Sequence, residues 1–275
     1  MPGNAPPLLG VGPALLFCPA DRPDRIRKAA GVADAVIVDL EDAVAPAGKE
    51  AARAHVVDAL RDLGTNRIVV RVNAVSTPWH EDDLRSLADR PDTVVMLPMA
   101  ASPEEVEALA PHPVIALCET AAGVLAAPAI AGADNCVGLM WGGEDLAADL
   151  GSRRRPGRGP GRAPVADHAR WTVLLAARAR GRRAIDTVYT DLADVEGLEH
   201  DAAEAAESGF DAKACVHPRQ VPAVRAAFLA TPDEVAWARR VLTAAEAEGG
   251  AFGFEGAMVD APVLARARRI LSVSG

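Results

Sequence analysis

The chain has 275 residues, and with half of them apolar it can bury one large core. Its 38 acidic and 29 basic side chains give a formal net charge of -9, which disfavours nucleic acid as a partner because the phosphate backbone is itself negative. The sequence has no run of about 18 apolar residues and no basic, apolar leader, so we expect a cytoplasmic protein without a membrane partner.

Short apolar runs alternate with helix-like segments along the whole chain. We expect strands at residues 14–18, 35–39, 67–72, 93–97, 113–117, 137–140, 184–188 and 212–216. Eight strands separated by helices predict a TIM (β/α)8 barrel, an α/β fold that places its active site at the carboxyl ends of the strands.

Ser102 and Thr231 each combine an N-cap side chain, a following proline and a glutamate three positions later. This pattern is typical of helix N-termini, so we expect helices to begin at Pro103 and Pro232. The second of these helices comes after the eighth strand and its own helix near 218–228. We therefore expect a barrel over residues 1–230 and an additional C-terminal helical segment over 231–275, which packs on the barrel or on a neighbouring subunit.

Residues 152–164 interrupt this order with five arginines interleaved with glycine and proline. Such a composition cannot bury apolar surface, so we expect a loop. The simpler interpretation is a solvated insertion. An alternative is a flap over an anionic substrate, because the loop follows the segment that carries Asp145.

Two carboxylates follow consecutive predicted strands, Glu119 after residues 113–117 and Asp145 after residues 137–140. The carboxyl ends of barrel strands meet at one face, and the small residues after each carboxylate leave room for a ligand. Two carboxylates leave most of an octahedral Mg²⁺ shell to water and substrate oxygens. Each residue alone could instead cap the next helix, but for the pair we favour a metal site.

A second acidic group, Asp39, Glu41 and Asp42, stands at the end of the second predicted strand. Like charges this close need a cation, the water shell of a metal, or a proton. Arg71 interrupts an apolar strand near its end, and its planar guanidinium fits a carboxylate through two hydrogen bonds. Arg71 can bind a substrate carboxylate or pair with Asp39 or Glu41, and these roles are compatible.

Other reactive side chains carry weaker signals. His217 follows the eighth strand, where a packing or hydrogen-bonding role is more common than general-base catalysis. The four cysteines form no CxxC pair, which predicts reduced and mostly buried thiols. The sequence has no GxSxG, HExxH, GxxxxGK or GxGxxG element, so hydrolase, zinc-protease, P-loop and dinucleotide-binding functions lack support.

These residues lie in motifs that resemble those of the citrate lyase β-subunit-like (CitE-like) proteins of the HpcH/HpaI aldolase superfamily. The resemblance runs in register from about residue 14 onward. Its motifs are LFCPADRP at 16–23, VDLEDAV at 38–44, RVNA at 71–74, MLP at 96–98, ETA at 119–121, GEDL at 143–146 and HPRQ at 217–220. FEGAMVDAP at 254–262 is similar to the closing segment of stand-alone actinobacterial members and of malyl-CoA lyases.

The resemblance implies a TIM barrel that assembles as a homotrimer or hexamer. It also implies Mg²⁺-dependent chemistry on an acyl-CoA thioester and an α-keto acid. By motif, Glu119 and Asp145 would be the metal ligands and Arg71 the clamp for the keto-acid carboxylate. Glu41, with Asp39, would organise metal-bound water.

Two further residues acquire a role only through the resemblance. Asp260 would reach a neighbouring subunit's site and exchange a proton with the α-carbon of the thioester, and Arg22 would contact the CoA phosphates. The chain also departs from the family, because Met99 stands where a lysine is usual and Ala122 where an arginine is usual. Both changes bear on thioester affinity and substrate choice.

The function expected is that of a carbon–carbon lyase that uses Mg²⁺ to cleave or form a 3-hydroxyacyl-CoA such as malyl-CoA, citramalyl-CoA or HMG-CoA. The fragments would be an α-keto acid or acetoacetate and acetyl-CoA. One alternative is a citrate lyase β subunit acting on a citryl group held by an acyl-carrier protein. Another is a non-catalytic or regulatory homologue, which Met99 and Ala122 favour, and a third is an aldolase that acts on free acids without CoA.

Overall fold

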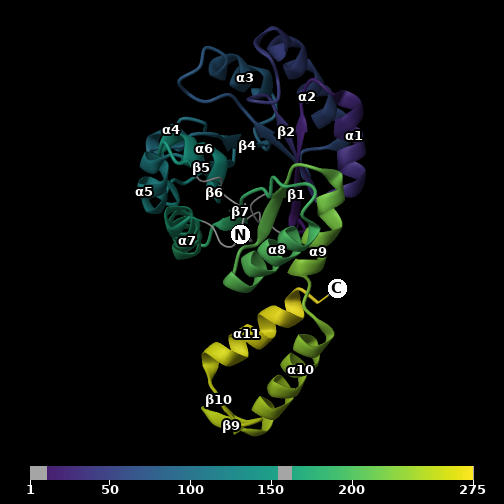
Figure 1. Ribbon diagram of the computed structural model, residues 1–275, viewed down its shortest axis with the longest axis vertical. Coiled ribbons are helices and arrows are strands. Elements are labelled where there is room, and N and C mark those ends of the chain that lie inside the picture. Colours follow the sequence, from purple (N-terminus) through teal and green to yellow (C-terminus); the bar gives the residue numbers. More distant parts are fainter. Residues whose placement is uncertain (1–10, 154–162, 275) are drawn as a thin grey trace. The chain divides into compact units, whose positions relative to one another are not determined.

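The computed structural model describes residues 11–153 and 163–274. The chain forms two compact units, Met1–Val224 and Arg225–Gly275. The first unit is a closed barrel of eight parallel strands in sequence order, which confirms the predicted fold (Figure 1). Its strands are β1 (Ala14–Pro19), β2 (Ala35–Asp39), β3 (Ile68–Arg71), β4 (Val94–Leu97), β5 (Val114–Cys118), β6 (Cys136–Trp141), β7 (Arg183–Asp186) and β8 (Ala212–Cys215).

Helices follow the strands and cover the outer face of the barrel (Figure 1). They are α1 (Pro23–Val32), α2 (Lys49–Leu63), α3 (His80–Leu87), α4 (Pro103–Glu107), α5 (Ala121–Ile130), α6 (Gly143–Asp149), α7 (Pro164–Ala179), α8 (Val195–Ser208) and α9 (Val221–Phe228), with the short 3-10 helices η1 (Pro46–Gly48) and η2 (Pro218–Gln220). The boundary between the two units falls within α9. Most of the predicted arginine-rich loop, residues 154–162, lies outside the described residues.

Most of the barrel strands form where the sequence concentrates Val, Ile and Leu, because branched side chains pack well on a pleated surface. Those that point into the barrel make its core, which includes Leu15, Ile37, Val69, Met96 and Ile115. Parallel pairing also sets which residues meet at the strand ends. In particular, Asp39 at the end of β2 lies opposite Arg71 at the end of β3.

The predicted helix starts at Pro103 and Pro232 are confirmed. The Ser102 hydroxyl accepts a hydrogen bond from the Glu105 N–H at 3.3 Å. Thr231 and Glu234 form a reciprocal capping box, in which each side chain accepts a hydrogen bond from the other residue's N–H. These contacts satisfy backbone donors that the first turn of a helix leaves unpaired.

The second unit consists of α10 (Pro232–Ala247), a hairpin of β9 (Phe252–Phe254) and β10 (Ala257–Val259), and α11 (Ala261–Ser272). The sequence analysis did not predict the hairpin. Its two turn residues, Glu255 and Gly256, have positive φ angles of 46° and 81°. Asn-Gly or Asp-Gly usually marks such a turn, so Glu-Gly is a weak signal.

The unit boundary at Val224 lies before residue 230, where the sequence prediction ends the barrel. The packing of residues 231–275 on the barrel or on a neighbouring subunit stays a prediction. The four cysteines form no disulfide and are buried, as expected. Within residues 11–153 and 163–274, no helix is both long enough and apolar enough to cross a membrane.

Candidate active site

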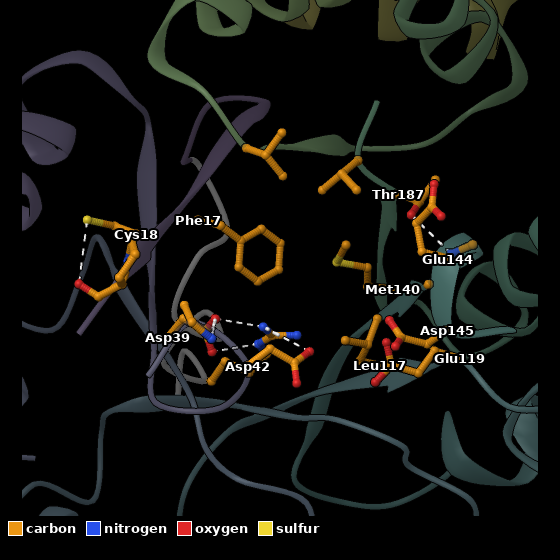
Figure 2. A pocket seen from close by; sticks show the side chains of 17 residues that line it. Phe17, Cys18, Asp39, Asp42, Leu117, Glu119, Met140, Glu144, Asp145 and Thr187 are labelled. Atoms are coloured by element: carbon orange, nitrogen blue, oxygen red, sulfur yellow. Dashed lines mark hydrogen bonds and ion pairs between the residues drawn. The ribbon is translucent and has the colours of Figure 1, made fainter. Parts of the chain in front are cut away.

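A pocket of about 390 Å³ lies at the carboxyl ends of the barrel strands (Figure 2). Its polar lining lies at or just after the ends of β2, β3, β5, β6 and β7 and includes Asp39, Asp42, Arg71, Glu119, Glu144, Asp145 and Thr187. Its apolar lining comes from the barrel interior and the last strands, namely Phe17, Leu117, Met140, Val188 and Val216. An apolar pocket with a few converging polar groups is the usual form of a small-molecule site.

The two predicted metal ligands lie next to one another on one wall of this pocket (Figure 2). Glu119 directly follows β5 and is only 2% exposed, and its Oε1 accepts a hydrogen bond of 3.0 Å from the Met99 N–H. Burial, together with the negative charge of Asp145, raises the pKa of Glu119 to about 9. Two neighbouring carboxylates favour either a cation that both bind or the uptake of a proton by one of them.

Neither carboxylate caps a helix, so the capping alternative is wrong for both. The N-cap of α5 is Thr120, whose hydroxyl accepts from the Gly123 N–H at 3.0 Å, and the N-cap of α6 is Gly142. Asp145 follows β6 in the chain but, contrary to expectation, does not itself end that strand. Strand β6 ends at Trp141, and Asp145 lies in the first turn of α6.

Gly142 makes room for Glu119. A Cβ atom at position 142 would lie 2.6 Å from both the Cβ and the Oε2 of Glu119, closer than packed atoms can approach. The φ and ψ of Gly142 are −113° and 111°, an extended conformation that any residue adopts. The requirement for glycine is therefore steric, and it arises from the Glu119 side chain.

Arg71 lies in the pocket lining beside the acidic group after β2. Its Nε and Nη2 donate to the two carboxylate oxygens of Asp39 at 2.8 and 2.6 Å. Its Nη1 is 3.0 Å from Glu41 Oε2, and its guanidinium carbon is 5.1 Å from the centre of the Phe17 ring. Asp39 takes two of the five N–H groups, so Nη1 and Nη2 keep donors for Glu41 and for a ligand.

Glu41 contacts Arg71 but is not among the described residues that line the pocket. Burial raises the pKa of Glu41 to about 7; Arg71 opposes this shift, and the nearby Asp42 and Asp39 add to it. Asp39 also accepts the N–H groups of Glu41 at 2.9 Å and Ala43 at 3.2 Å, so it holds both the arginine and the loop. Glu41 therefore influences the pocket indirectly, by contacting the Arg71 side chain that lines it.

The donor set fits a divalent cation such as Mg²⁺. Among the described residues, Arg71 pairs with Asp39, Glu41 and Asp42 at the edge of the pocket, and Glu119 and Asp145 add two carboxylates to its lining. Carboxylate oxygens are the ligands that Mg²⁺ prefers, and Mg²⁺ keeps several coordination positions for water or substrate. Among the described residues no group of three or more His, Cys, Asp and Glu is placed to hold a metal, so Glu119 and Asp145 would leave most positions open.

Residues 14–218 match the sequence model of the family described as HpcH/HpaI aldolase/citrate lyase. The chain belongs to this family. It is 53% identical over 273 residues to a citrate lyase subunit beta-like protein of Mycobacterium tuberculosis, which covers 98% of this chain and 97% of that protein. It is also 38% identical to a (3S)-malyl-CoA thioesterase of Cereibacter sphaeroides (91% and 88% covered) and 31% identical to the mitochondrial citramalyl-CoA lyase of Rattus norvegicus (95% and 85%).

Solved structures of this family superpose on the chain. CitE from Mycobacterium tuberculosis in complex with magnesium, acetoacetate and coenzyme A has a TM-score of 0.90 and 51% identity, covering 96% of this chain and 98% of that one. CitE from the same organism with magnesium and pyruvate has a TM-score of 0.81 and 46% identity, covering 95% and 98%. The barrel expected from the HpcH/HpaI resemblance is therefore shared with experimentally determined relatives.

Two further predicted residues of this HpcH/HpaI member, Arg22 and Asp260, each make a local contact within the unit that carries them. Arg22 occupies the N-cap position of α1 after β1, is exposed, and lies 3.5 Å from Asp21. Asp260, in the second unit, is the N-cap of α11 and accepts the Val263 N–H at 3.4 Å. The expected roles of Arg22 toward CoA and of Asp260 toward a neighbouring site stay predictions.

His217 has a local structural role, as the sequence analysis favoured. Its Nδ1 accepts a hydrogen bond from the Arg219 N–H at 3.1 Å, and the Gln220 side chain accepts from the His217 N–H at 3.1 Å. These contacts form the capping box of η2. No general-base role is needed to explain the position of this histidine.

Sequence reasoning missed two structural contributions from this face of the barrel. One is the backbone of Met99, which has a positive φ of 53° and so directs its N–H at the metal-ligand candidate Glu119. A non-glycine residue in this region is uncommon and often marks a functional site. The other is Lys49, whose buried side chain contacts the loop after β2 that carries Glu41 and Asp42. It was missed because lysine side chains are mostly exposed in folded proteins.

Proposed function

We propose that this HpcH/HpaI member is a Mg²⁺-dependent carbon–carbon lyase that cleaves a 3-hydroxyacyl-CoA, or forms it in the reverse direction. The observation that carries the proposal is that Glu119 and Asp145 share a pocket with the Arg71 guanidinium. In Figure 2 the two carboxylates lie across the pocket from Asp39, which holds that guanidinium. A cation site facing an arginine suits a substrate with a carboxylate next to a hydroxyl or carbonyl oxygen.

A Mg²⁺ ion held by Glu119 and Asp145 would supply the Lewis acid that stabilises negative charge on the substrate oxygens. Arg71 would bind the substrate carboxylate with the N–H groups that Asp39 and Glu41 do not use. Asp39 keeps the guanidinium in one orientation, which avoids the cost of ordering it when substrate arrives. The HMG-CoA, citramalyl-CoA and malyl-CoA thioesters all offer a carboxylate for such a clamp.

The cleavage step has a simple balance. The hydroxyl proton leaves to a base, the hydroxyl carbon becomes a carbonyl, and the electron pair of the broken C–C bond passes to the α-carbon of the acyl-CoA. We propose that Asp260 of a neighbouring copy in a homotrimer or hexamer then protonates that carbon, and that Glu41 with Asp39 orders water beside the metal site. Arg22, exposed after β1, is proposed to contact the CoA phosphates.

The relatives support this reaction class. Solved CitE of Mycobacterium tuberculosis holds magnesium, acetoacetate and coenzyme A, and a relative from Rattus norvegicus is named citramalyl-CoA lyase. A second candidate is thioester hydrolysis, because a relative at 38% identity is named (3S)-malyl-CoA thioesterase. In that reaction water breaks the C–S bond and releases a free hydroxy acid and CoA.

The test is to incubate the protein with Mg²⁺ and malyl-, citramalyl- or HMG-CoA and to identify the products by mass spectrometry. We expect acetyl-CoA with glyoxylate, pyruvate or acetoacetate, and loss of turnover in Glu119→Gln and Asp145→Asn. Glu107→Gln, which changes an exposed glutamate on α4, is the matched control and should retain full activity.

Other products would select other functions. Free CoA and a hydroxy acid would indicate the thioesterase, and turnover of only a citryl-acyl-carrier protein would indicate a citrate lyase β subunit. Magnesium binding without turnover of any thioester would indicate a non-catalytic homologue. Undiminished cleavage by Glu119→Gln would refute the assignment of the metal site.

A further inference from the structure

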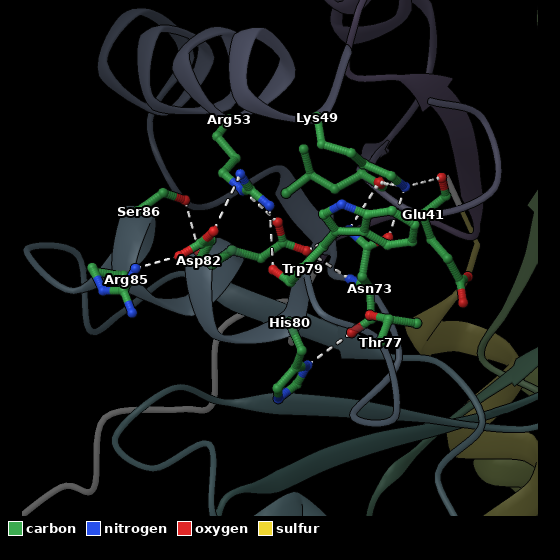
Figure 3. A network of polar contacts seen from close by, with 12 residues as sticks. Glu41, Lys49, Arg53, Asn73, Thr77, Trp79, His80, Asp82, Arg85 and Ser86 are labelled. Atoms are coloured by element: carbon green, nitrogen blue, oxygen red, sulfur yellow. Dashed lines mark hydrogen bonds and ion pairs between the residues drawn. The ribbon is translucent and has the colours of Figure 1, made fainter. Parts of the chain in front are cut away.

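A buried lysine contacts the loop after β2 that carries Glu41 and Asp42 (Figure 3). Lys49 is the first residue of α2 and is only 4% exposed. Its ammonium group donates to the backbone oxygens of Leu40 at 2.6 Å and Glu41 at 2.7 Å and to the Oδ1 of Asn73 at 2.7 Å. An ammonium has three N–H donors, so these oxygens use all of them.

The three acceptors lie in the segments that follow two different barrel strands. Leu40 and Glu41 follow β2, whereas Asn73 lies two residues after Arg71, the last residue of β3. Asn73 also joins the two loops itself, because its Nδ2 donates to the Leu40 oxygen at 3.1 Å. Lys49 therefore ties the segment that carries Glu41 to the segment that carries Arg71.

A buried carboxylate completes the cluster from the side of α3. Asp83 is fully buried, and its Oδ2 accepts both the backbone N–H of Asn73 at 2.8 Å and the Asn73 Nδ2 at 2.6 Å. Its Oδ1 accepts from Arg53 Nε at 2.7 Å, and the Trp79 ring lies 5.0 Å from the Lys49 ammonium. None of the three Lys49 acceptors is a carboxylate oxygen. Burial lowers the pKa of Lys49, and the negative charges of Asp83, Asp39 and Glu41 oppose that shift.

We propose that Lys49 is a positioning residue that sets the spacing between Glu41 and Arg71 at the edge of the active-site pocket. Both backbone polar groups of Glu41 are held. Its N–H donates to Asp39 Oδ1 at 2.9 Å, and its carbonyl oxygen accepts a hydrogen bond from Lys49. Its carboxylate then meets Arg71 Nη1 at 3.0 Å. Lys49 itself has no donor left for a substrate, so it acts through these neighbours.

The first test measures hydrogen exchange and needs no substrate. The backbone N–H groups of Glu41 and Ala43 both donate hydrogen bonds to Asp39. In Lys49→Met their amide protons should exchange at least tenfold faster than in the parent protein. Arg53→Met is the matched control, since it removes the outer contact to Asp83 but leaves the three Lys49 contacts in place. We expect it to lower the melting temperature without changing exchange at Glu41 and Ala43.

The second test asks whether Lys49 acts through Glu41 and rests on the proposed function. Calorimetry with pyruvate and Mg²⁺ should show at least tenfold weaker pyruvate binding in Lys49→Met. In a Glu41→Gln background the same change should cost less than twofold, because contacting residues are not additive. If Lys49→Met does not fold, Lys49→Gln keeps two N–H donors without the charge and serves in both tests.

The outcomes separate this inference from the proposed reaction. Unchanged exchange at Glu41 and Ala43, or equal loosening by Arg53→Met, would show that Lys49 serves only the stability of the fold. Equal losses of binding with and without Glu41 would overturn the route through that residue. If the parent protein binds no keto acid and cleaves no thioester, the proposed function fails, while the exchange measurement still decides the positioning role.

Discussion

Changing Glu119 to glutamine should stabilise the metal-free protein, and the gain should grow with pH. The Glu119 carboxyl is 2% exposed in the folded chain, and its pKa there is about 9, against 4.5 for an unperturbed glutamate. Between these values the folded state holds a proton that the unfolded state has lost. Stability therefore falls as pH rises from 4.5 toward 9, since folding then requires the uptake of a proton.

The magnitude follows from the width of that pH window. Each pH unit above 4.5 costs about 1.4 kcal/mol, so at pH 7.5 the burden on folding is at most about 4 kcal/mol. Glutamine carries no such burden, and its amide oxygen can still accept the Met99 N–H. We expect Glu119→Gln to raise the melting temperature at pH 7.5 by up to about 10 °C, with little gain at pH 4.5.

The assay is thermal unfolding in the presence of EDTA, at several pH values between 4.5 and 8.5. Glu107→Gln, on the exposed surface of α4, should change the free energy of unfolding by less than about 0.5 kcal/mol at every pH. Saturating Mg²⁺ should stabilise the wild type but not Glu119→Gln, because only the wild type binds the ion. A gain that is absent at pH 8, or that is the same at every pH, would refute the reasoning.

Three further predictions test neighbouring parts of the chain. Gly142→Ala should weaken Mg²⁺ binding at least tenfold, measured by calorimetry, because the new Cβ collides with Glu119. The control is Gly31→Ala in helix α1, where a Cβ would meet nothing within 4 Å; it should instead stabilise the chain by about 1 kcal/mol. Mg²⁺ affinity should rise about tenfold per pH unit up to pH 9, since the ion must displace the Glu119 proton; a flat affinity between pH 6.5 and 8.5 would contradict this. Refolded mixtures of inactive Glu119→Ala and Asp260→Ala should recover about one quarter of wild-type turnover if each site in a cyclic oligomer uses both copies; no recovery would argue against a shared site.

Much of the barrel could be predicted because its signals are local. Most barrel strands are short runs rich in branched apolar residues, and helix starts such as that at Pro103 carry their own capping side chains. The acidic residues near strand ends were visible for the same reason, since the carboxyl ends of barrel strands share one face. The C-terminal hairpin was missed because its turn residues, Glu255 and Gly256, are a weak turn signal.

The sequence by itself determined the order of the barrel strands and their helices and the candidate ligands Glu119 and Asp145, because periodicity and residue type can be read along the chain. Only the tertiary structure decided how these groups are used. Arg71 meets Asp39 because β2 and β3 pair in that register, and Gly142 is required because Glu119 extends from the neighbouring strand. The burial of Lys49 likewise depends on the fold, which brings the Asn73 side chain, 24 residues away, together with the backbone oxygens of Leu40 and Glu41.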